Sequence, residues 1–236
     1  MSGKQTAIIT GASGGIGAGL VERFLVEDYN VVATARDASR KLTSAAGLVL
    51  VDGDIAGQQT ADHTVEAAIN NFGTVDVLVN VAGIFLTKPF TDFNANDFDA
   101  LISTNLLGFF LITQRAVREM LKQESGCVIT ITAALADRPI AGVNGSISMM
   151  TKGGLNAATE NLAVEYANDG IRFNAVAPGV VDTAMHRNDP NDSTLQPAMK
   201  KATVKDIVDA VVYLVQAGHV SGEILRVDGA APTRRW

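Results

Sequence analysis

The sequence predicts an α/β protein with one domain, in which helices cover both faces of a doubly wound parallel sheet. Short, continuously apolar segments alternate with segments of helical spacing, as expected when both faces of each strand are buried. The 236 residues are 47% hydrophobic and 19% charged, which suits one well-packed core. No repeat or Pro/Gly-rich linker divides the chain, so residues 1–236 are expected to form a single domain.

The order of apolar and amphipathic segments fixes the expected elements. Each apolar segment is only a few residues long and is separated from the next by polar or glycine-containing stretches. The expected strands are residues 7–10, 30–35, 47–51, 75–79, 127–132, 173–177 and 224–227. The expected helices that matter here cover residues 16–25, 61–72, 97–120 and 152–166.

The helix expected over residues 97–120 is apolar on every side. A helix of this kind needs two buried faces, one against the sheet and one against further protein. We expect another subunit there, giving a homodimer or homotetramer; the alternative is a helix buried within one chain. The apolar residues concerned are Leu106, Leu107, Phe109, Phe110, Leu111 and Ile112.

A glycine-rich turn, Thr10-Gly11-Ala12-Ser13-Gly14-Gly15-Ile16-Gly17, follows the first expected strand. Glycines let backbone N–H groups approach a pyrophosphate, and the next helix directs its positive N-terminus at the same anion. A purely structural turn is the alternative. The position between the first strand and the first helix favours dinucleotide binding.

Charge and cysteine content exclude several classes of function. The net charge of −6 argues against a general binder of nucleic acid, and the single Cys127 excludes an intramolecular disulfide. Cys127 lies in an apolar segment and is expected to be a buried thiol. His63 and His219 have no metal-ligand neighbours, so no metal site is expected. A polar start and the lack of a long uninterrupted apolar run predict a cytoplasmic protein without a membrane span.

Further motifs follow the glycine turn in a fixed order. They are Asp54-Ile55, Asn80-Val81-Ala82-Gly83, Asn105, Lys152, Pro178-Gly179 with Thr183, and Val227-Asp228-Gly229. Over nearly the whole chain, this series resembles the short-chain dehydrogenase/reductase family. The resemblance implies a Rossmann-type fold, a nicotinamide cofactor and oxidation or reduction of a small-molecule alcohol or carbonyl.

The same resemblance assigns expected roles to individual residues. Asn105 and Lys152 match two members of the family's catalytic Asn-Ser-Tyr-Lys set, and Thr132 occupies the position next to the catalytic serine, which falls on Ala133. The implied cofactor contacts are Gly11, Ser13, Gly15, Ile16, Gly17, Arg36, Asp54, Ile55, Asn80, Ala82, Gly83, Lys152, Pro178, Gly179, Val181 and Thr183.

The end of the second strand predicts the choice of cofactor. The acidic position of family members that use NAD falls on Ala35, and Arg36 follows it. An arginine there can pair with the extra phosphate of NADP, so NADP(H) is expected over NAD(H). The alternatives are a solvated Arg36 and ribose recognition by Asp37.

Ser148 stands four residues before Lys152, where the family has the tyrosine that transfers the proton. No tyrosine occurs between Tyr29 and Tyr166, so a small shift in alignment does not supply one. Ser148 is expected either to take part in a modified proton path or to act as a helix N-cap. Asp137, Arg138 and His186 are weaker candidates, with a surface ion pair the expected role of the first two.

Two functions of different classes remain. One is an NADP(H)-dependent oxidoreductase with a modified proton-transfer site. The other is a catalytically impaired nucleotide-binding protein of the same fold that acts as a sensor, scaffold or partner subunit. A polar insertion at about residues 184–202 is expected to form a lid over the substrate.

Overall fold

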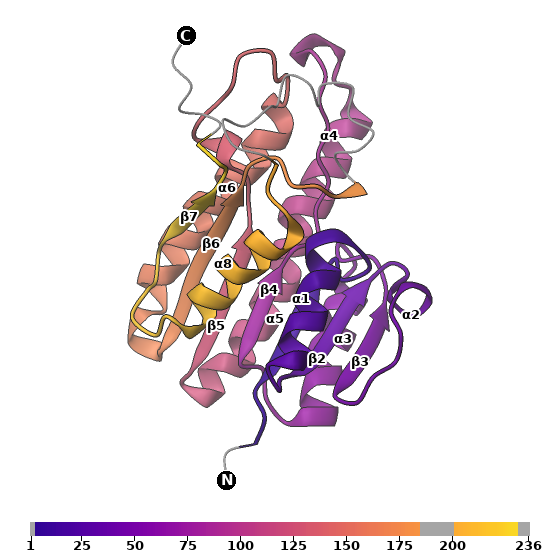
Figure 1. The fold of residues 1–236 in the computed structure, drawn as a ribbon, viewed down its shortest axis with the longest axis vertical. Coiled ribbons are helices and arrows are strands. Elements are labelled where there is room, and N and C mark those ends of the chain that lie inside the picture. The colour runs from indigo at the N-terminus through magenta and orange to yellow at the C-terminus, as the bar shows by residue number, and fades with distance from the viewer. Residues whose placement is uncertain (1–2, 185–200, 231–236) are drawn as a thin grey trace.

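A computed structural model describes residues 3–184 and 201–230, and it contains one seven-stranded parallel sheet. The strand order is β3-β2-β1-β4-β5-β6-β7, so the chain turns back at β1 and builds outward again from β4 (Figure 1). The strands are β1 Thr6–Thr10, β2 Asn30–Ala35, β3 Leu48–Asp52, β4 Val77–Asn80, β5 Gly126–Ile131, β6 Ile171–Pro178 and β7 Ile224–Val227. The predicted doubly wound sheet is confirmed, and each predicted strand overlaps an observed one.

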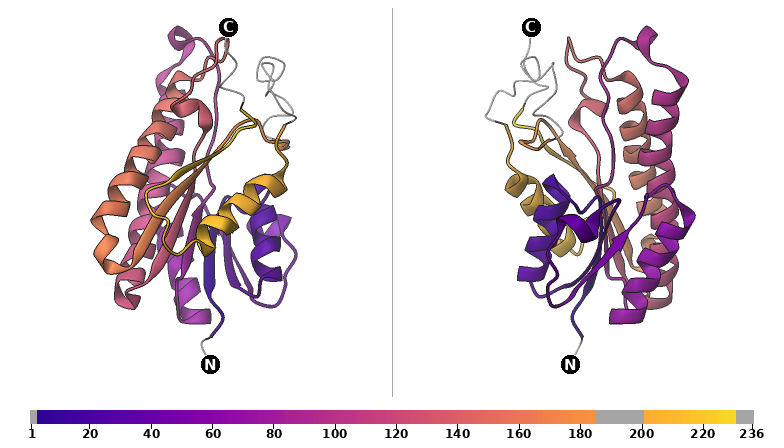
Figure 2. Two further views of the ribbon diagram at one scale, coloured as in Figure 1. Left: turned by 60° about the vertical axis from the view of Figure 1, so that its left-hand side comes forward. Right: turned by 90° about the vertical axis from the view of Figure 1, so that its right-hand side faces the viewer.

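The helices form a layer on each face of the sheet (Figure 2). On one face lie α1 (Gly15–Val26) and α8 (Val204–Gln216); the core there includes Phe24 and Ile207. On the other face lie α3 (Gln58–Phe72), α5 (Gly108–Gln123) and α6 (Ser146–Glu165), over a core that includes Met120 and Phe173. A short helix, α2 (Ala38–Lys41), follows β2, and α4 (Ala95–Leu101) leads into the central helix.

The central helix is interrupted by a π-helical segment, Ile102–Leu107, between α4 and α5. Such a segment widens the backbone turn and is common at functional sites. Asn105 lies inside it, with only 1% of its surface exposed. The buried Asn105 amide therefore lies at the point where the regular helical geometry is interrupted.

Within the helical run Ala95–Gln123, an 18-residue window with a mean hydropathy of 1.3 is long and apolar enough to cross a membrane by length and composition. The core helix of a soluble protein meets the same criteria. Leu111, Ile112, Val117 and Met120 of this run are buried against the sheet, as expected for a core helix. The sequence contains no long uninterrupted apolar run, but that test alone did not detect this helical run as a candidate membrane span. The packing of its buried residues against the sheet is better evidence of where the helix lies.

The faces of the central helix and of α6 that are exposed in the chain differ from those predicted to contact another subunit. The helical spacing of Leu155, Leu162, Ala163 and Tyr166 in α6 predicts a second subunit contact on this helix. Leu155 and Ala163 are buried within the chain, and Tyr166 stacks on Phe173 with ring centroids 5.8 Å apart. These residues therefore pack on the sheet. The exposed large apolar side chains of these helices are Phe98, Leu107, Phe110, Leu121, Met150 and Val164.

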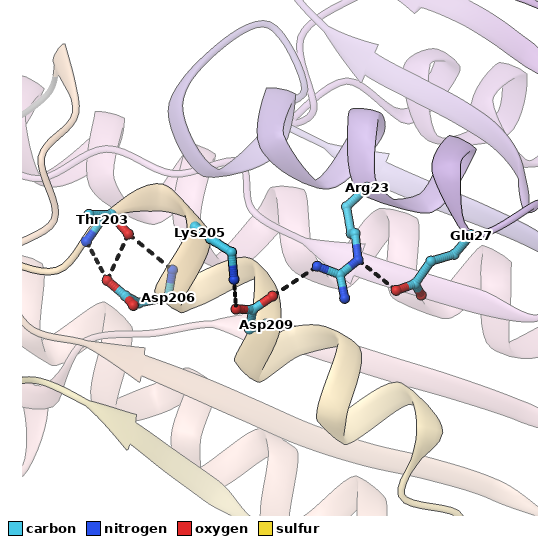
Figure 3. A network of polar contacts seen from close by, with 6 residues as sticks. All are labelled: Arg23, Glu27, Thr203, Lys205, Asp206 and Asp209. Atoms are coloured by element: carbon cyan, nitrogen blue, oxygen red, sulfur yellow. Dashed lines mark hydrogen bonds and ion pairs between the residues drawn. The ribbon is translucent and has the colours of Figure 1, made fainter.

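Polar contacts join α1 to α8 and fix the start of α8 (Figure 3). The Thr203 side chain accepts from the Asp206 amide, and the Asp206 carboxylate accepts from the Thr203 amide at 2.7 Å, which makes a capping box. The Thr203 hydroxyl also donates to the Asp206 carboxylate at 2.7 Å, and this bond, together with the bond from the Thr203 amide, lowers the pKa of Asp206. Arg23 of α1 donates to Asp209 of α8 at 2.9 Å. Helix α8 is thereby capped at its start and joined to α1 on the same face of the sheet.

Candidate functional site

A cavity of about 320 Å³ opens at the carboxyl ends of the strands, where the strand order reverses between β1 and β4. Ligands of doubly wound sheets bind at this switch point. Among the residues predicted from the sequence, the cavity is lined by Gly11, Gly15, Ile16, Ala82, Gly83, Thr132, Lys152, Pro178, Gly179, Val181 and Thr183.

The first half of the cavity is a cradle of backbone formed by the glycine turn. Gly11 has a φ of +63°, and a Cβ there would lie 2.8 Å from the Ala82 backbone. A Cβ on Gly17 would lie 2.2 Å from the Gly11 carbonyl oxygen. Side chains are therefore excluded, and backbone N–H groups at the start of α1 can approach an anion. This cradle fits the pyrophosphate of a dinucleotide.

Thr10 ties the glycine turn to the next strand. Its hydroxyl oxygen accepts from the backbone N–H groups of Val81 at 3.0 Å and Ala82 at 3.1 Å. Thr183, in the segment that follows β6, closes the same region, because its methyl group lies 3.2 Å from where a Gly15 Cβ would be. Three motifs that are far apart in the sequence are thus assembled around one turn.

Several predicted cofactor residues lie outside the cavity lining. Ile55 is buried in the core beside Gly108, and the Asn80 side chain donates to Thr113 at 2.9 Å. Asp54 accepts from the Ala56 amide at 2.9 Å. Ser13, Gly17 and Arg36 are likewise not among the residues that line it.

Arg36 extends into solvent at the end of β2, and it makes no hydrogen bond or ion pair with the described residues. The acidic groups nearby are already partnered. Asp37 lies 3.9 Å from Lys41, and Asp52 accepts from the Ser39 amide at 2.9 Å and from the Ser39 hydroxyl. The Ser39 bonds lower the pKa of Asp52. Arg36 therefore has no ion-pair partner among the described residues at this end of the sheet, and the same holds for Arg40 of α2.

The second half of the cavity contains Lys152 of α6. Its Nζ donates to the Ile131 carbonyl oxygen at 2.9 Å and lies 3.2 Å from where a Gly83 Cβ would be. Burial lowers the pKa of Lys152 to about 8. Thr132 lies on the same wall, and its hydroxyl faces the Val176 carbonyl oxygen at 3.4 Å. Ala133 lines the cavity with a methyl group only.

Asn105 and Ser148 lie behind this wall and do not line the cavity. The Asn105 amide donates to the Ile84 carbonyl at 3.0 Å and to the Thr151 hydroxyl at 2.9 Å, and its Oδ1 accepts from the Ile84 N–H at 2.8 Å. The fully buried Ser148 hydroxyl donates to the Leu86 carbonyl at 2.8 Å and accepts from the Leu86 N–H at 2.9 Å. Its donor and one acceptor site are therefore engaged.

The expectation that Ser148 acts as an N-cap is wrong. Helix α6 begins at Ser146 with Gly145 as its N-cap, which places Ser148 inside the first turn. Asp137 forms a surface ion pair, as the sequence led us to expect, and its partner is Arg226. His186 and nearly all of the expected lid lie outside the described residues.

The sequence prediction missed the apolar end of the cavity. Ile84, Phe85, Ala134, Leu135 and Ile140 contribute to its lining. The available signal was the apolar run that continues from Gly83 through Leu86, beyond the recognised motif. Asp228 was noted only as part of a motif, but it also lines the cavity and packs against Gly179.

The family described as short chain dehydrogenase matches residues 5–194. The chain belongs to this family. Glucose 1-dehydrogenase 2 of Bacillus subtilis is 32% identical over 247 residues, which cover 97% of this chain and 95% of the relative. The predicted family is thus confirmed.

Solved structures of relatives agree with this result. The structure described as ElxO with NADP bound is 27% identical, with a TM-score of 0.89, and the match covers 98% of this chain and 100% of that one. The 3-ketoacyl-(acyl-carrier-protein) reductase of Brucella melitensis, complexed with NADH, is 27% identical with a TM-score of 0.90, over 97% and 98% of the chains. These likenesses confirm the Rossmann-type fold and support a nicotinamide cofactor.

Proposed function

We propose that the protein is an NADP(H)-dependent oxidoreductase that interconverts a carbonyl compound and its alcohol, with a modified proton-transfer site. The observation that carries this proposal is one cavity that joins a side-chain-free dinucleotide cradle to Lys152. Its relatives named above, a dehydrogenase and a reductase, favour turnover over binding alone.

The chain's own residues divide the work of binding. The glycine turn and the N-terminus of α1 hold the pyrophosphate, while Pro178, Gly179 and Thr183 border the nicotinamide end. When bound, the cofactor would supply a hydride to the carbonyl carbon, or accept one from the corresponding alcohol carbon in the reverse direction. Arg36 selects NADP(H) by pairing with the additional phosphate, since no described acidic group neutralises its charge.

Lys152 supplies the proton in this proposal. Among the described residues that line the cavity, it is the one whose pKa lies near neutrality, at about 8, and its position between Ile131 and Gly83 places Nζ at the catalytic end. The ammonium delivers a proton to the developing alkoxide, and the neutral amine is reprotonated from solvent. Ser148 occupies the tyrosine position of the family, but its hydroxyl is held by Leu86.

We also infer that the protein is a soluble, cytoplasmic homo-oligomer. We assign the subunit contact to exposed apolar side chains of the central helix and α6, among them Leu107, Phe110, Met150 and Val164. Burying such residues against a second copy removes apolar area from water. Light scattering after size exclusion should report a dimer or tetramer, and a stable monomer at micromolar concentration would contradict this part of the proposal.

The decisive experiment is a screen of carbonyl compounds that follows consumption of NADPH and of NADH, with both affinities measured on the same preparation. We expect NADPH to bind more tightly and to be consumed with at least one carbonyl compound. Tight cofactor binding without turnover across the screen would instead support the nucleotide-binding protein of the same fold that lacks redox activity.

A further inference from the structure

The segment Ile84–Leu86 is held at both ends by buried polar side chains from two different helices. Asn105 of the π-helical segment bonds both the N–H and the C=O of Ile84, at 2.8 and 3.0 Å. Ser148 of α6 bonds both the N–H and the C=O of Leu86, at 2.9 and 2.8 Å. The two side chains therefore pair with alternate residues, as a neighbouring strand would.

Burial makes these two contacts strong constraints on the segment. Asn105 is 1% exposed and Ser148 is fully buried, so water cannot replace either partner without local opening. Phe85 lies between the two held residues and lines the cavity. Its ring also packs on Gly145, where a Cβ would lie 3.4 Å from Cε2.

The wall that Phe85 joins is apolar. Ile84, Ala133, Leu135 and Ile140 line the same cavity, and none offers a charged or hydrogen-bonding side chain. A substrate with an apolar body loses little hydration there, whereas a sugar or a carboxylate would leave its polar groups without side-chain partners on this wall.

We propose that Ser148 is a positioning residue that fixes Phe85, and that the wall so formed selects carbonyl compounds with an apolar body. This inference rests on the proposed function for its substrate, and it assigns Ser148 a role other than proton transfer. A tyrosine at position 148 could not replace these bonds, because its phenol oxygen lies at the far end of a ring and not beside Cβ.

The first test measures amide hydrogen exchange and needs no turnover. In Ser148→Ala, the Leu86 amide should exchange at least about tenfold faster, which corresponds to 1.4 kcal/mol or more of lost protection. The Ile84 amide, still held by Asn105, should remain protected. Ser146→Ala is the matched control, because Ser146 is an exposed serine in the same helical turn. Unchanged Leu86 exchange, or an equal effect of the control, would overturn the positioning role.

The second test uses 2-butanone and 4-phenyl-2-butanone, which differ by one phenyl group. With bound NADP⁺, saturation-transfer NMR should show the phenyl ketone binding at least about tenfold more tightly to the unmodified protein. Phe85→Ala and Ser148→Ala should each remove most of this preference, and the double variant should lose little more. Equal binding of the two ketones to the unmodified protein would overturn the assignment of the substrate class.

The kinetic measurement separates this inference from the proposed function. With NADPH, Ser148→Ala should raise KM for the phenyl ketone while kcat changes less than about threefold, because the proton donor is untouched. A collapse of kcat without a change in KM would make Ser148 part of the proton path and overturn the inference. If neither ketone is reduced but the exchange and binding results hold, the proposed turnover fails and the positioning role stands.

Discussion

The cofactor half of the cavity and its catalytic half are built from different materials. The cofactor half is made of backbone. Gly11 and Gly17 leave no room for side chains, and the Thr10 hydroxyl accepts hydrogen bonds from two backbone N–H groups of the segment after β4. The other half contains the side chain of Lys152, and Asn105 and Ser148 support its wall from behind. Backbone geometry tolerates little change, whereas side-chain chemistry can be rewired. The glycine turn should therefore tolerate substitution less well than the side chains around Lys152.

The largest effect should come from breaking the catalytic half at its proton donor. Lys152→Met should lower the rate of carbonyl reduction by about 10²- to 10⁴-fold, the range of general acid catalysis. Lys122→Met is the matched control, since Lys122 lies on the surface of α5 and pairs with Glu119. In the unmodified protein, reduction should slow as the pH rises above about 8, where Lys152 loses its proton. A flat profile from pH 6 to 10 would remove Lys152 from this role.

The same lysine should also affect stability. Its pKa falls from an ordinary value of 10.5 to about 8 because burial disfavours the charged form. The unfolded chain therefore binds more protons than the folded protein between these two values, and the burial penalty is fully present below pH 8. Its contribution should make unfolding harder as the pH rises from about 8 to 10.5. Urea titrations at several pH values across this window give the unfolding free energy of the protein and of Lys152→Met. This free energy should rise more steeply with pH in the unmodified protein, and parallel pH dependences would argue against the shift.

Adding a single methyl group to the glycine turn should weaken cofactor binding. Gly17→Ala places a Cβ 2.2 Å from the Gly11 carbonyl oxygen and should weaken NADPH binding by about 10- to 100-fold, as the turn shifts to relieve the overlap. Gly153→Ala adds the same methyl group where nothing lies within 4 Å, and its affinity for NADPH should be unchanged. Fluorescence titration measures both. Equal affinities would show that the cradle is softer than its geometry indicates.

A smaller effect is expected at the end of β2, where Arg36 should set the preference for NADPH over NADH. Arg36→Ala should reduce the preference for NADPH over NADH by about tenfold or more, through loss of a charge-assisted bond to the additional phosphate. Arg118→Ala is the control, because it removes one exposed positive charge from α5. If the unmodified protein binds NADH as tightly as NADPH, ribose recognition by Asp37 becomes the better explanation.

The smallest effect should lie outside both halves, where α8 begins. Thr203→Ala removes one side of the capping box and should lower the unfolding free energy by about 1 kcal/mol. NADPH affinity should stay within twofold, since Thr203 does not line the cavity. Thermal unfolding with and without NADPH tests this. A large loss of affinity would show that the start of α8 is coupled to the cofactor half.

The fold and the glycine turn of the cofactor half could be predicted from the sequence alone. Continuous apolar segments and their spacing from helices place the strands, because a buried parallel strand must be apolar on both faces. The glycine turn could be recognised for a similar reason, since the positions of Gly11 and Gly17 allow no other side chain. Such constraints act locally along the chain, so they leave a readable pattern.

The partners of the side chains around Lys152 could be identified only from the folded structure. Ser148 is near Lys152 in sequence, but its bonds go to Leu86, which is 62 residues away. The apolar wall around Phe85 likewise joins segments after β4 and β5, whose strands pair in the sheet but lie far apart in the chain. A serine hydroxyl takes whichever partner folding brings within about 3 Å, and no local pattern records that choice. Its role therefore follows from packing rather than from its position in a motif.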